Sequence, residues 1–298
     1  MRYAGEFAAL GTAVCWSAGS NLFAAAGRRM GSITLNRLRI TTAAILLGLA
    51  LWITRGSPWP AWASAAQIGL LAASGLIGFV FGDRYYFRSL VILGPGRAAL
   101  IASLAPIFTT LLGVPVLGEM PGPLALLGIA LTLGGLFWVL AQQVRSHHES
   151  VEGSIAVGVM SGVLGALGQA GGYVISKLAL RTGLDPLSAT VIRASAATVA
   201  IWILAGIQGD AGRSFQALRD RRATGFMVGG AFFGPFLGVT LSLTALKFIE
   251  AGVAASITAF YPVLTILIAS RFHGERITWR LMVGAIVAVA GVVVLFLR

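Results

Sequence analysis

The sequence predicts an all-α integral membrane protein with ten transmembrane helices, arranged as two inverted five-helix repeats. Its 298 residues are 57% hydrophobic and only 11% charged, and the mean hydropathy is +0.88. Soluble domains average about 45–50% apolar and about 25% charged residues, so this composition is typical of a chain that crosses a membrane several times. A long stretch of the sequence also occurs twice, which divides the chain into two related halves.

The duplicated stretch covers residues 78–119 and recurs, without a gap, 156 positions later over residues 234–275. Matches between small or apolar residues are common in so hydrophobic a chain. The shared proline at Pro106 and Pro262, and a shared Gly-Glu pair at the end of both stretches, are not explained by composition. Internal repeats in a membrane protein are typical of transporters.

Ten apolar segments are long enough to cross a bilayer, which takes about 20 residues. Clusters of glycine and proline separate many neighbouring segments, as expected for helix ends. The first segment is longer than the roughly 7–15 apolar residues of a secretory signal, so we expect it to remain as a helix. The third and eighth segments are expected to extend to about residues 90 and 248. The ten segments lie at about 6–26, 34–54, 64–82, 96–117, 124–142, 154–176, 187–207, 224–246, 252–271 and 279–297.

Residues 1–146 are expected to form the first repeat and residues 154–298 the second, joined by a hinge loop at 147–153. Because five helices begin and end on opposite sides of a membrane, the second repeat must enter from the side opposite to the first. Inverted repeats are expected for alternating access around a site near the membrane midplane. Arginines are more frequent in loops after odd-numbered segments, so the positive-inside rule places both termini outside the cytoplasm.

The net charge of +12 is attributed to loops that lie on the cytoplasmic side and contact anionic membrane lipid. Nucleic acid is not expected as a partner, because no basic cluster alternates with exposed aromatic residues. The single cysteine, Cys15, excludes an internal disulfide and a cysteine metal site. Signature motifs of metalloproteases, hydrolases and P-loop enzymes are missing from the sequence. We therefore predict no enzyme activity, cofactor or metal, with an intramembrane enzyme as a remote alternative.

Charged residues inside the segments are few, and such residues are costly and functional by default. Arg39 and Arg193 lie a turn or more into the second and seventh segments; they are candidate repeat counterparts, and both are long enough to snorkel to the interface. Asp83, at the end of the third segment, either pairs with Arg39, Arg84 or Arg88 or lies at the mouth of a cavity. There it would bind an ammonium group or titrate during transport. Proton-coupled exchange of cationic drugs needs such a carboxylate and is disfavoured unless Asp83 supplies it.

Neutral polar and aromatic side chains are predicted to line the pathway, because pockets combine apolar walls with a few placed polar groups. Gln169 is a lone amide on a face of the sixth segment that is otherwise glycine and serine, so it contacts either a partner helix or a cavity. Pro106 and Pro262 lie near the middle of the fourth and ninth segments and are either fixed kinks or a pair of hinges. The predicted cavity residues are Trp16, Ser20, Asn21, Asp83, Tyr85, Tyr86, Ser103, Gln169, Tyr173, Ser242, Thr258 and Tyr261.

Each of Pro106 and Pro262 is followed, after eleven residues, by a Gly-Glu pair, at 118–119 and 274–275. Together with the two five-helix units, this pattern resembles the EamA-type transporters of the drug/metabolite transporter superfamily. The resemblance implies that helices 1–4 and 6–9 surround a central cavity and that helices 5 and 10 are peripheral. It also implies cytoplasmic termini, in conflict with the loop charges.

By this resemblance the expected function is export of amino acids, including aromatic ones, and of related small metabolites across a bacterial inner (plasma) membrane. The expected partners are a small-molecule substrate and membrane lipid, and a monomer is expected to suffice. A drug or lipid-linked-sugar translocator, with or without proton coupling, is the alternative within transport.

Overall fold

The computed structural model describes residues 3–146, 154–265 and 279–298, which contain helices and no strands. The predicted hinge loop and the Gly-Glu pair at 274–275 lie outside the described residues. The first half contains α1 (Ala4–Met30), α2 (Ser32–Arg55), α3 (Ala65–Gly75), the π-helical η1 (Leu76–Gly82), α4 (Asp83–Leu93), α5 (Pro95–Ala102), α6 (Ala105–Leu117) and α7 (Pro123–Ser146). The second half contains α8 (Ile155–Leu180), α9 (Pro186–Ile207), α10 (Ala211–Ala217), α11 (Arg221–Ala231), the π-helical η2 (Phe232–Gly238), α12 (Val239–Phe248), α13 (Ala251–Thr258) and α15 (Trp279–Leu297).

Eight helices of the described residues are long and apolar enough to cross a membrane, which supports a multi-pass membrane protein but not the predicted number of ten. Although α1 has 27 residues, it is less apolar, because polar side chains at positions 17, 20 and 21 lower its hydropathy. The helix that starts at α13, Ala251–Thr265, is apolar but shorter. The eight spans are Ser32–Arg55, Ala65–Leu93, Arg97–Leu117, Pro123–Gln142, Ile155–Leu180, Pro186–Ile207, Arg221–Phe248 and Trp279–Leu297.

Backbone irregularities occur at matching places in the two halves. The π-helical turns η1 and η2 lie 156 residues apart at both ends (76 to 232 and 82 to 238). The helices that carry the two repeated prolines are both broken just before the proline. At these breaks Leu104 N donates to Ile101 O at 3.0 Å, and Phe260 N donates to Ile257 O at 3.2 Å, which forms a tighter turn. The repeat in the sequence is therefore also a repeat in backbone geometry.

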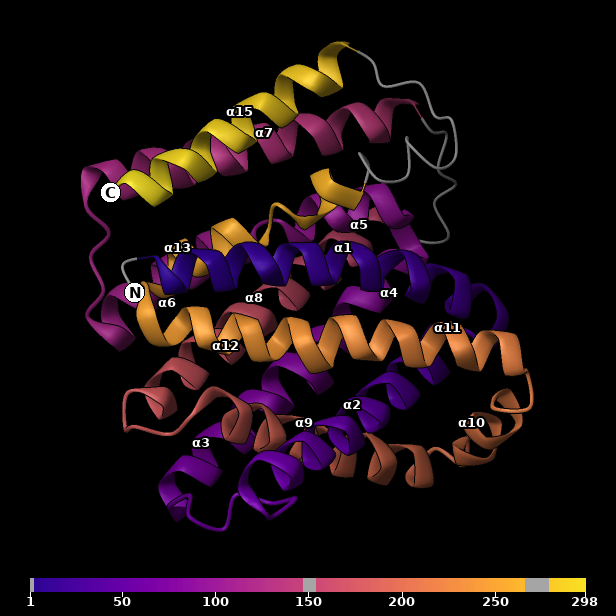
Figure 1. The fold of residues 1–298 in the computed structure, drawn as a ribbon. Coiled ribbons are helices and arrows are strands. Elements are labelled where there is room, and N and C mark those ends of the chain that lie inside the picture. The colour runs from indigo at the N-terminus through magenta and orange to yellow at the C-terminus, as the bar shows by residue number, and fades with distance from the viewer. Residues whose placement is uncertain (1–2, 147–153, 266–278) are drawn as a thin grey trace.

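Helix packing pairs elements from the two halves. The last helices of the halves, α7 and α15, pack along each other at one side of the bundle (Figure 1), as the resemblance implied for helices 5 and 10. In the main body α4 of the first half packs along α8, the first helix of the second half. In the same way α1, the first helix of the first half, packs along α11 and α12 of the second half. α2 packs against α9, its counterpart in the other half.

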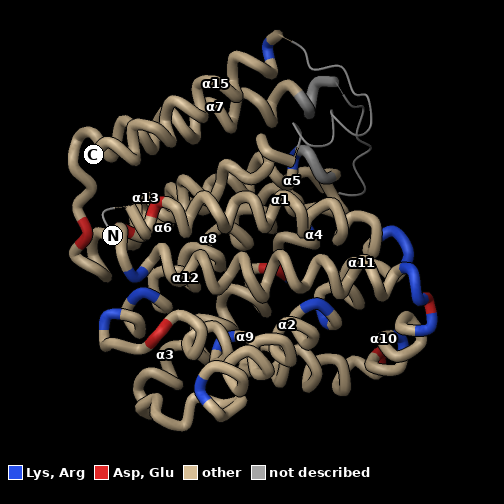
Figure 2. The backbone as a smooth tube through the Cα atoms, viewed as in Figure 1, with Lys and Arg blue, Asp and Glu red and all other residues tan. Residues whose placement is uncertain are grey.

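Both termini lie at the same end of the bundle (Figure 1), which we call the terminal end. The turns that follow α2, α6, α8 and α12 also lie at this end, because successive helices alternate in direction. Figure 2 shows Lys and Arg at both ends, with a group around the turn between α10 and α11 at the opposite end. The spans between the ends carry few charges, so the charged side chains inside them are informative.

Glycines let η1 and α4 approach α8 closely. A methyl group on Gly168 would lie 2.7 Å from the Cα atom of Gly82, and one on Gly165 would lie 2.9 Å from the backbone N of Tyr86. Such backbone contact between small residues is typical of helices that associate in membranes. We call Gly82, Gly165 and Gly168 the glycine seam. It brings α8 next to the first turn of α4, where the buried Asp83 lies.

Candidate functional site

Asp83, the first residue of α4, lies inside the bundle with 5% of its surface exposed. Its carboxylate forms an ion pair with Arg39 of α2 and accepts a hydrogen bond of 2.9 Å from Nε2 of Gln169 on α8. Of the pairings that the sequence left open, the one with Arg39 is formed. Of the two interpretations of Gln169, the contact with a partner helix is observed. Its amide binds Asp83, the only acid on α4 of the other half. Three helices from both halves therefore meet at one acid.

Arg39 has partners on several sides. Its Nε donates to Oδ1 of Asn36 at 2.8 Å, and its guanidinium carbon lies 5.4 and 5.8 Å from the ring centres of Phe23 and Phe87. With 6% of its surface exposed, Arg39 does not snorkel to the interface, so that interpretation is wrong. Charges inside a protein must be paired and hydrogen-bonded, and Arg39 and Asp83 satisfy each other in this way.

Arg193, on α9, is 1% exposed and does not snorkel either. Its guanidinium carbon lies 4.9 Å from the ring centre of Phe79 on η1, and it interacts electrostatically with Asp83 and Tyr173. Unlike Arg39, it forms no ion pair within the part of the chain that the structure describes, and its Nε and Nη1 lack hydrogen-bond partners. We call Arg39, Asp83, Gln169 and Arg193 the buried cluster.

Arg39 and Arg193 occupy equivalent places in the two halves, since each is the eighth residue of its helix, α2 (Ser32–Arg55) or α9 (Pro186–Ile207). Arg37, two residues before Arg39 on α2, has partners of its own. Arg37 pairs with Asp210 at 2.7 Å and donates to Oγ of Ser214 at 2.7 Å, so it holds α10 against α2 near the opposite end. The two equivalent arginines, Arg39 and Arg193, differ in their partners: Arg39 pairs with Asp83, whereas Arg193 forms no ion pair among the described residues.

Several of the predicted cavity residues adjoin the buried cluster. Tyr86 lies three residues after Asp83 on α4, in the electrostatic neighbourhood of Tyr261 from the ninth segment. Tyr173, four residues after Gln169 on α8, accepts a hydrogen bond of 2.6 Å from Oγ of Ser242 on α12. Aromatic and hydroxyl groups from α4, α8 and α12 thus lie in the neighbourhood of the buried cluster.

The three predicted residues of α1 have other partners. Trp16 packs against the glycines of η2. Ser20 donates to the carbonyl of Ser17 at 3.0 Å, and its Oγ lies 3.4 Å from Oγ1 of Thr265. Asn21 is exposed and donates to the same Ser17 carbonyl. These side chains join α1 to the second half or bond within α1, rather than joining the buried cluster.

The remaining predicted cavity residues are scattered. Tyr85 packs on the exposed Phe81, with ring centres 4.7 Å apart. Ser103 donates to the carbonyl of Leu100 at 2.6 Å, at the end of α5. Thr258, at the end of α13, is buried and its hydroxyl has no hydrogen-bond partner. Within residues 3–146, 154–265 and 279–298, no three His, Cys, Asp or Glu side chains come together in a way that could hold a metal ion.

Pro106 is the second residue of α6, and Pro262 follows the matching break after α13. The sequence predicted prolines within continuous helices, and the structure instead shows broken helices. Near the start of a helix the missing N–H of a proline costs no hydrogen bond, because the first N–H groups have no partner within the helix. The hinge role stays a prediction.

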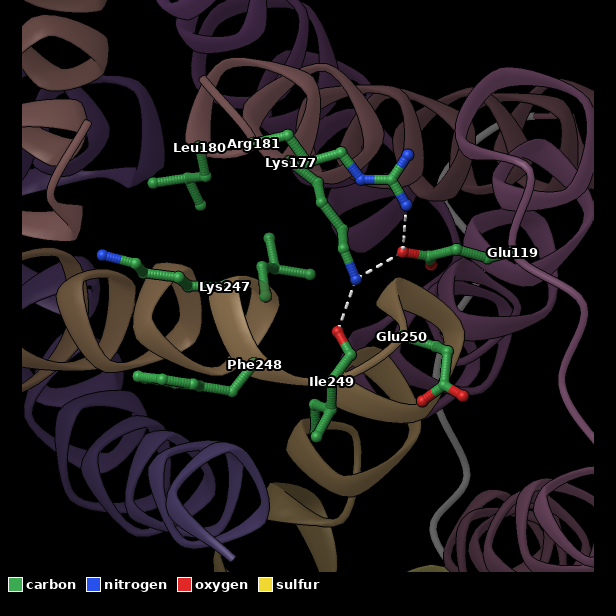
Figure 3. A pocket seen from close by; sticks show the side chains of 9 residues that line it. Glu119, Lys177, Leu180, Arg181, Lys247, Phe248, Ile249 and Glu250 are labelled. Carbon is green, nitrogen blue, oxygen red and sulfur yellow. Dashed lines mark hydrogen bonds and ion pairs between the residues drawn. The ribbon is translucent and has the colours of Figure 1, made fainter. Parts of the chain in front are cut away.

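A pocket of about 380 Å³ opens at the terminal end, beside the ends of α8 and α12 (Figure 3). The carboxylate of Glu119 pairs there with Lys177 and, at 3.0 Å, with Arg181. It also accepts a hydrogen bond of 2.7 Å from the backbone N of Ala251, the first residue of α13. Lys177 donates in addition to the carbonyl of Ile249. We call Glu119, Lys177 and Arg181 the terminal charge network; it ties the two halves together.

Arg298 extends the charged groups at this end, since it pairs with Glu250 and, at 3.5 Å, with Glu6. Burial opposes ionisation of Glu250, but the hydrogen bond from Arg298 and the charges of Arg298 and Lys177 outweigh it and lower the pKa of this carboxyl below its ordinary value. The sequence did not single out Lys177 as a functional residue. One feature of the sequence could have indicated that Lys177 is buried. It directly follows Ser176, on a helix whose small residues predicted close packing.

Comparisons with known proteins agree with a transporter. The model of the EamA-like transporter family matches residues 3–141 and 156–297. An uncharacterized transporter of Archaeoglobus fulgidus is 24% identical over 295 residues, which cover 97% of this chain and 96% of its own. A protein of known crystal structure shares the fold over 99% of this chain and 96% of its own, with a TM-score of 0.74 and 18% identity. That last likeness concerns the fold alone.

Proposed function

Because the chain belongs to the EamA-like transporter family, we propose that it exports amino acids, including aromatic ones, and related small metabolites by alternating access. The observation that carries the choice of solute is the buried cluster. An amino acid has an ammonium group, a carboxylate and a side chain. The cluster offers a carboxylate at Asp83, a guanidinium at Arg193 and the aromatic rings of Phe79, Tyr86 and Tyr173.

The proposal includes the topology that the transport mechanism needs. We assign ten spans by adding α1 and the helix from Ala251 to the eight apolar ones, so that residues 1–146 and 154–298 form inverted repeats around a central cavity. Alternating access then exposes one site to the two sides in turn. Pro106 and Pro262 are the proposed hinges, the proposed location is a bacterial inner (plasma) membrane, and a monomer is sufficient.

Counterflow in proteoliposomes tests the proposal. Vesicles loaded with an unlabelled amino acid should accumulate labelled phenylalanine, methionine or threonine without an imposed proton gradient, and protein-free vesicles should not. A panel of sugars and cationic drugs is run in parallel. If no amino acid exchanges while a cationic drug drives proton movement, the amino-acid assignment is wrong.

One observation favours the alternative of a proton-coupled drug or lipid-linked-sugar translocator. Asp83 is a buried carboxylate inside a span, and proton-coupled exchange of cations needs such a group. In that mechanism Arg39 would have to release the acid before a proton or a cation could bind. A pH-sensitive dye inside the vesicles separates the two functions, because amino-acid exchange without coupling leaves the internal pH unchanged.

A further inference from the structure

Among the described residues, Arg193 differs from the other two buried arginines, Arg37 and Arg39, in forming no ion pair with an acid. Arg39 pairs with Asp83, and Arg37 pairs with Asp210. Arg193 is the most buried of the three, yet its Nε and Nη1 have no hydrogen-bond partner. Buried polar groups in proteins are almost always hydrogen-bonded, and a buried charge without a partner is costly. This guanidinium is therefore suited to a partner that the described residues of the chain do not supply.

The surroundings of Arg193 favour an anion as that partner. Phe79 covers the guanidinium at 4.9 Å, and methyl groups on Gly78 and Gly172 would lie 3.3 and 3.4 Å from Nη2. The glycines thus leave room for the guanidinium and bring no acidic group. The acid that interacts with it electrostatically is Asp83, which already binds another arginine. Two guanidiniums share one carboxylate, so the buried cluster carries one surplus positive charge.

A neutral donor, the hydroxyl of Tyr173, lies in the electrostatic neighbourhood of the same guanidinium. Tyr173, which interacts electrostatically with Arg193, accepts its hydrogen bond from Ser242. Its own hydroxyl hydrogen is then available to a further acceptor. A guanidinium with a hydroxyl donor beside it matches the geometry of a carboxylate, which accepts several hydrogen bonds at once.

We propose that Arg193 binds the anionic group of the transported solute, which is the α-carboxylate when the solute is an amino acid. This inference rests on the proposed function for the identity of the solute. The ammonium group of the same solute then lies toward Asp83. Because the helices pack tightly around Arg193, the anion reaches it when the halves separate during alternating access. A free inorganic anion such as chloride has the same binding chemistry, and the experiment distinguishes it.

The first test uses the wild-type protein in lipid nanodiscs. Binding of phenylalanine, phenylalaninamide and phenethylamine is measured by the shift of the melting temperature over a concentration series. We expect the free acid to bind about tenfold more tightly than the amide or the amine, because both lack the carboxylate. Replacing chloride by methanesulfonate at constant ionic strength shows whether a free anion competes at the same site. Equal binding of the acid and the amide would overturn the proposal.

Variants assign the effect to the residue. Arg193→Gln should remove the preference for the acid, whereas Arg193→Lys, which keeps the charge, should retain part of it. Arg37→Gln is the control, since Arg37 is also a buried arginine but pairs with Asp210, away from the buried cluster, and should keep the preference. If Arg193→Gln does not fold, the Lys variant and the wild-type comparison still decide the question.

The outcomes separate this inference from the proposed function. If amino acids are exchanged but Arg193→Gln keeps the full preference for the acid, the function stands and the inference fails. If no amino acid binds, but chloride stabilises the wild type and not Arg193→Gln, the anion site stands and the amino-acid function fails.

Discussion

Asp83 is a buried charge whose environment has to compensate for the loss of water. Bringing an ion pair out of water is costly, and the pair is retained only when its hydrogen bonds are satisfied. Arg39 and Gln169 provide those bonds, and Asn36 with two phenylalanine rings completes the surroundings of the arginine. We therefore expect substitution of Asp83 to lower both stability and transport.

We expect Asp83→Asn to abolish most of the amino-acid exchange and to lower the melting temperature. Removing one partner of a buried pair costs about 3–5 kcal/mol, because the other charge is left unpaired. Counterflow and scanning fluorimetry measure the two effects. Asp210→Asn is the control, since its acid pairs with Arg37 near the end of the bundle. Unchanged exchange and unchanged pH dependence in Asp83→Asn would exclude this residue both from the site and from proton coupling.

At the scale of elements, the glycine seam determines how closely η1 and α4 approach α8. Because the atoms in contact are backbone atoms, the helices cannot adjust by a change of side-chain rotamer. The seam also explains the position of Gln169: it directly follows Gly168, so the close contact carries its amide to Asp83. Packing and site geometry thus depend on the same residues.

Gly168→Ala should destabilise the protein, because the added methyl group would lie 2.7 Å from the Cα atom of Gly82. Overpacking of this kind costs about 1–3 kcal/mol, which scanning fluorimetry in nanodiscs would report as a lower melting temperature. Gly69→Ala is the matched control on α3, since its methyl group would meet nothing within 4 Å. Equal melting temperatures for the two variants would show that the seam is not tight.

At the scale of the whole molecule, the terminal charge network joins the two halves at one end of the bundle. Glu119 comes from the first half, and its partners Lys177, Arg181 and Ala251 come from the second. The carboxylate also lies at the first turn of α13, where the helix dipole favours a negative charge. If the halves move relative to each other, these contacts have to break at the terminal end.

We therefore expect Glu119→Gln to open the terminal end more often. The glutamine keeps an acceptor for Ala251 but loses both ion pairs. Charged hydrogen bonds contribute about 1.5–3 kcal/mol, and each 1.4 kcal/mol changes a population about tenfold. A cysteine introduced at the buried, pocket-lining Leu246, with Cys15 replaced by serine, should then react about ten times faster with a maleimide.

Asp220→Asn is the control for that experiment, because its ion pair with Arg29 lies in the exposed turn at the opposite end. It should leave the labelling rate unchanged. A rate in Glu119→Gln that equals or falls below that of the control would mean that the terminal charge network does not hold the end closed.

The sequence was sufficient for features that depend on local composition or on identity between the halves. It predicted the helical membrane class, the extension of the third segment, seen as the span Ala65–Leu93, and the pairing of Asp83 with Arg39 as one of three options. It placed Pro106 and Pro262 within helices but missed the breaks before them. It left snorkelling open for Arg39 and Arg193, because a chain alone does not show how deeply neighbouring helices cover a side chain.

Hydrophobicity, segment length and the repeat are properties of the chain itself, so the sequence by itself determined that this is a duplicated, multi-pass helical protein. Only the tertiary structure decided which charges meet. The partners of Asp83, Glu119 and Arg193 come from helices remote in sequence, and their contacts depend on backbone approach at glycines and on the π-helical turn before α4. The sequence of an apolar segment does not show whether an arginine in it has an acidic partner on a neighbouring helix. Tertiary packing alone left Arg193 without an ion-pair partner in the part of the chain that the structure describes.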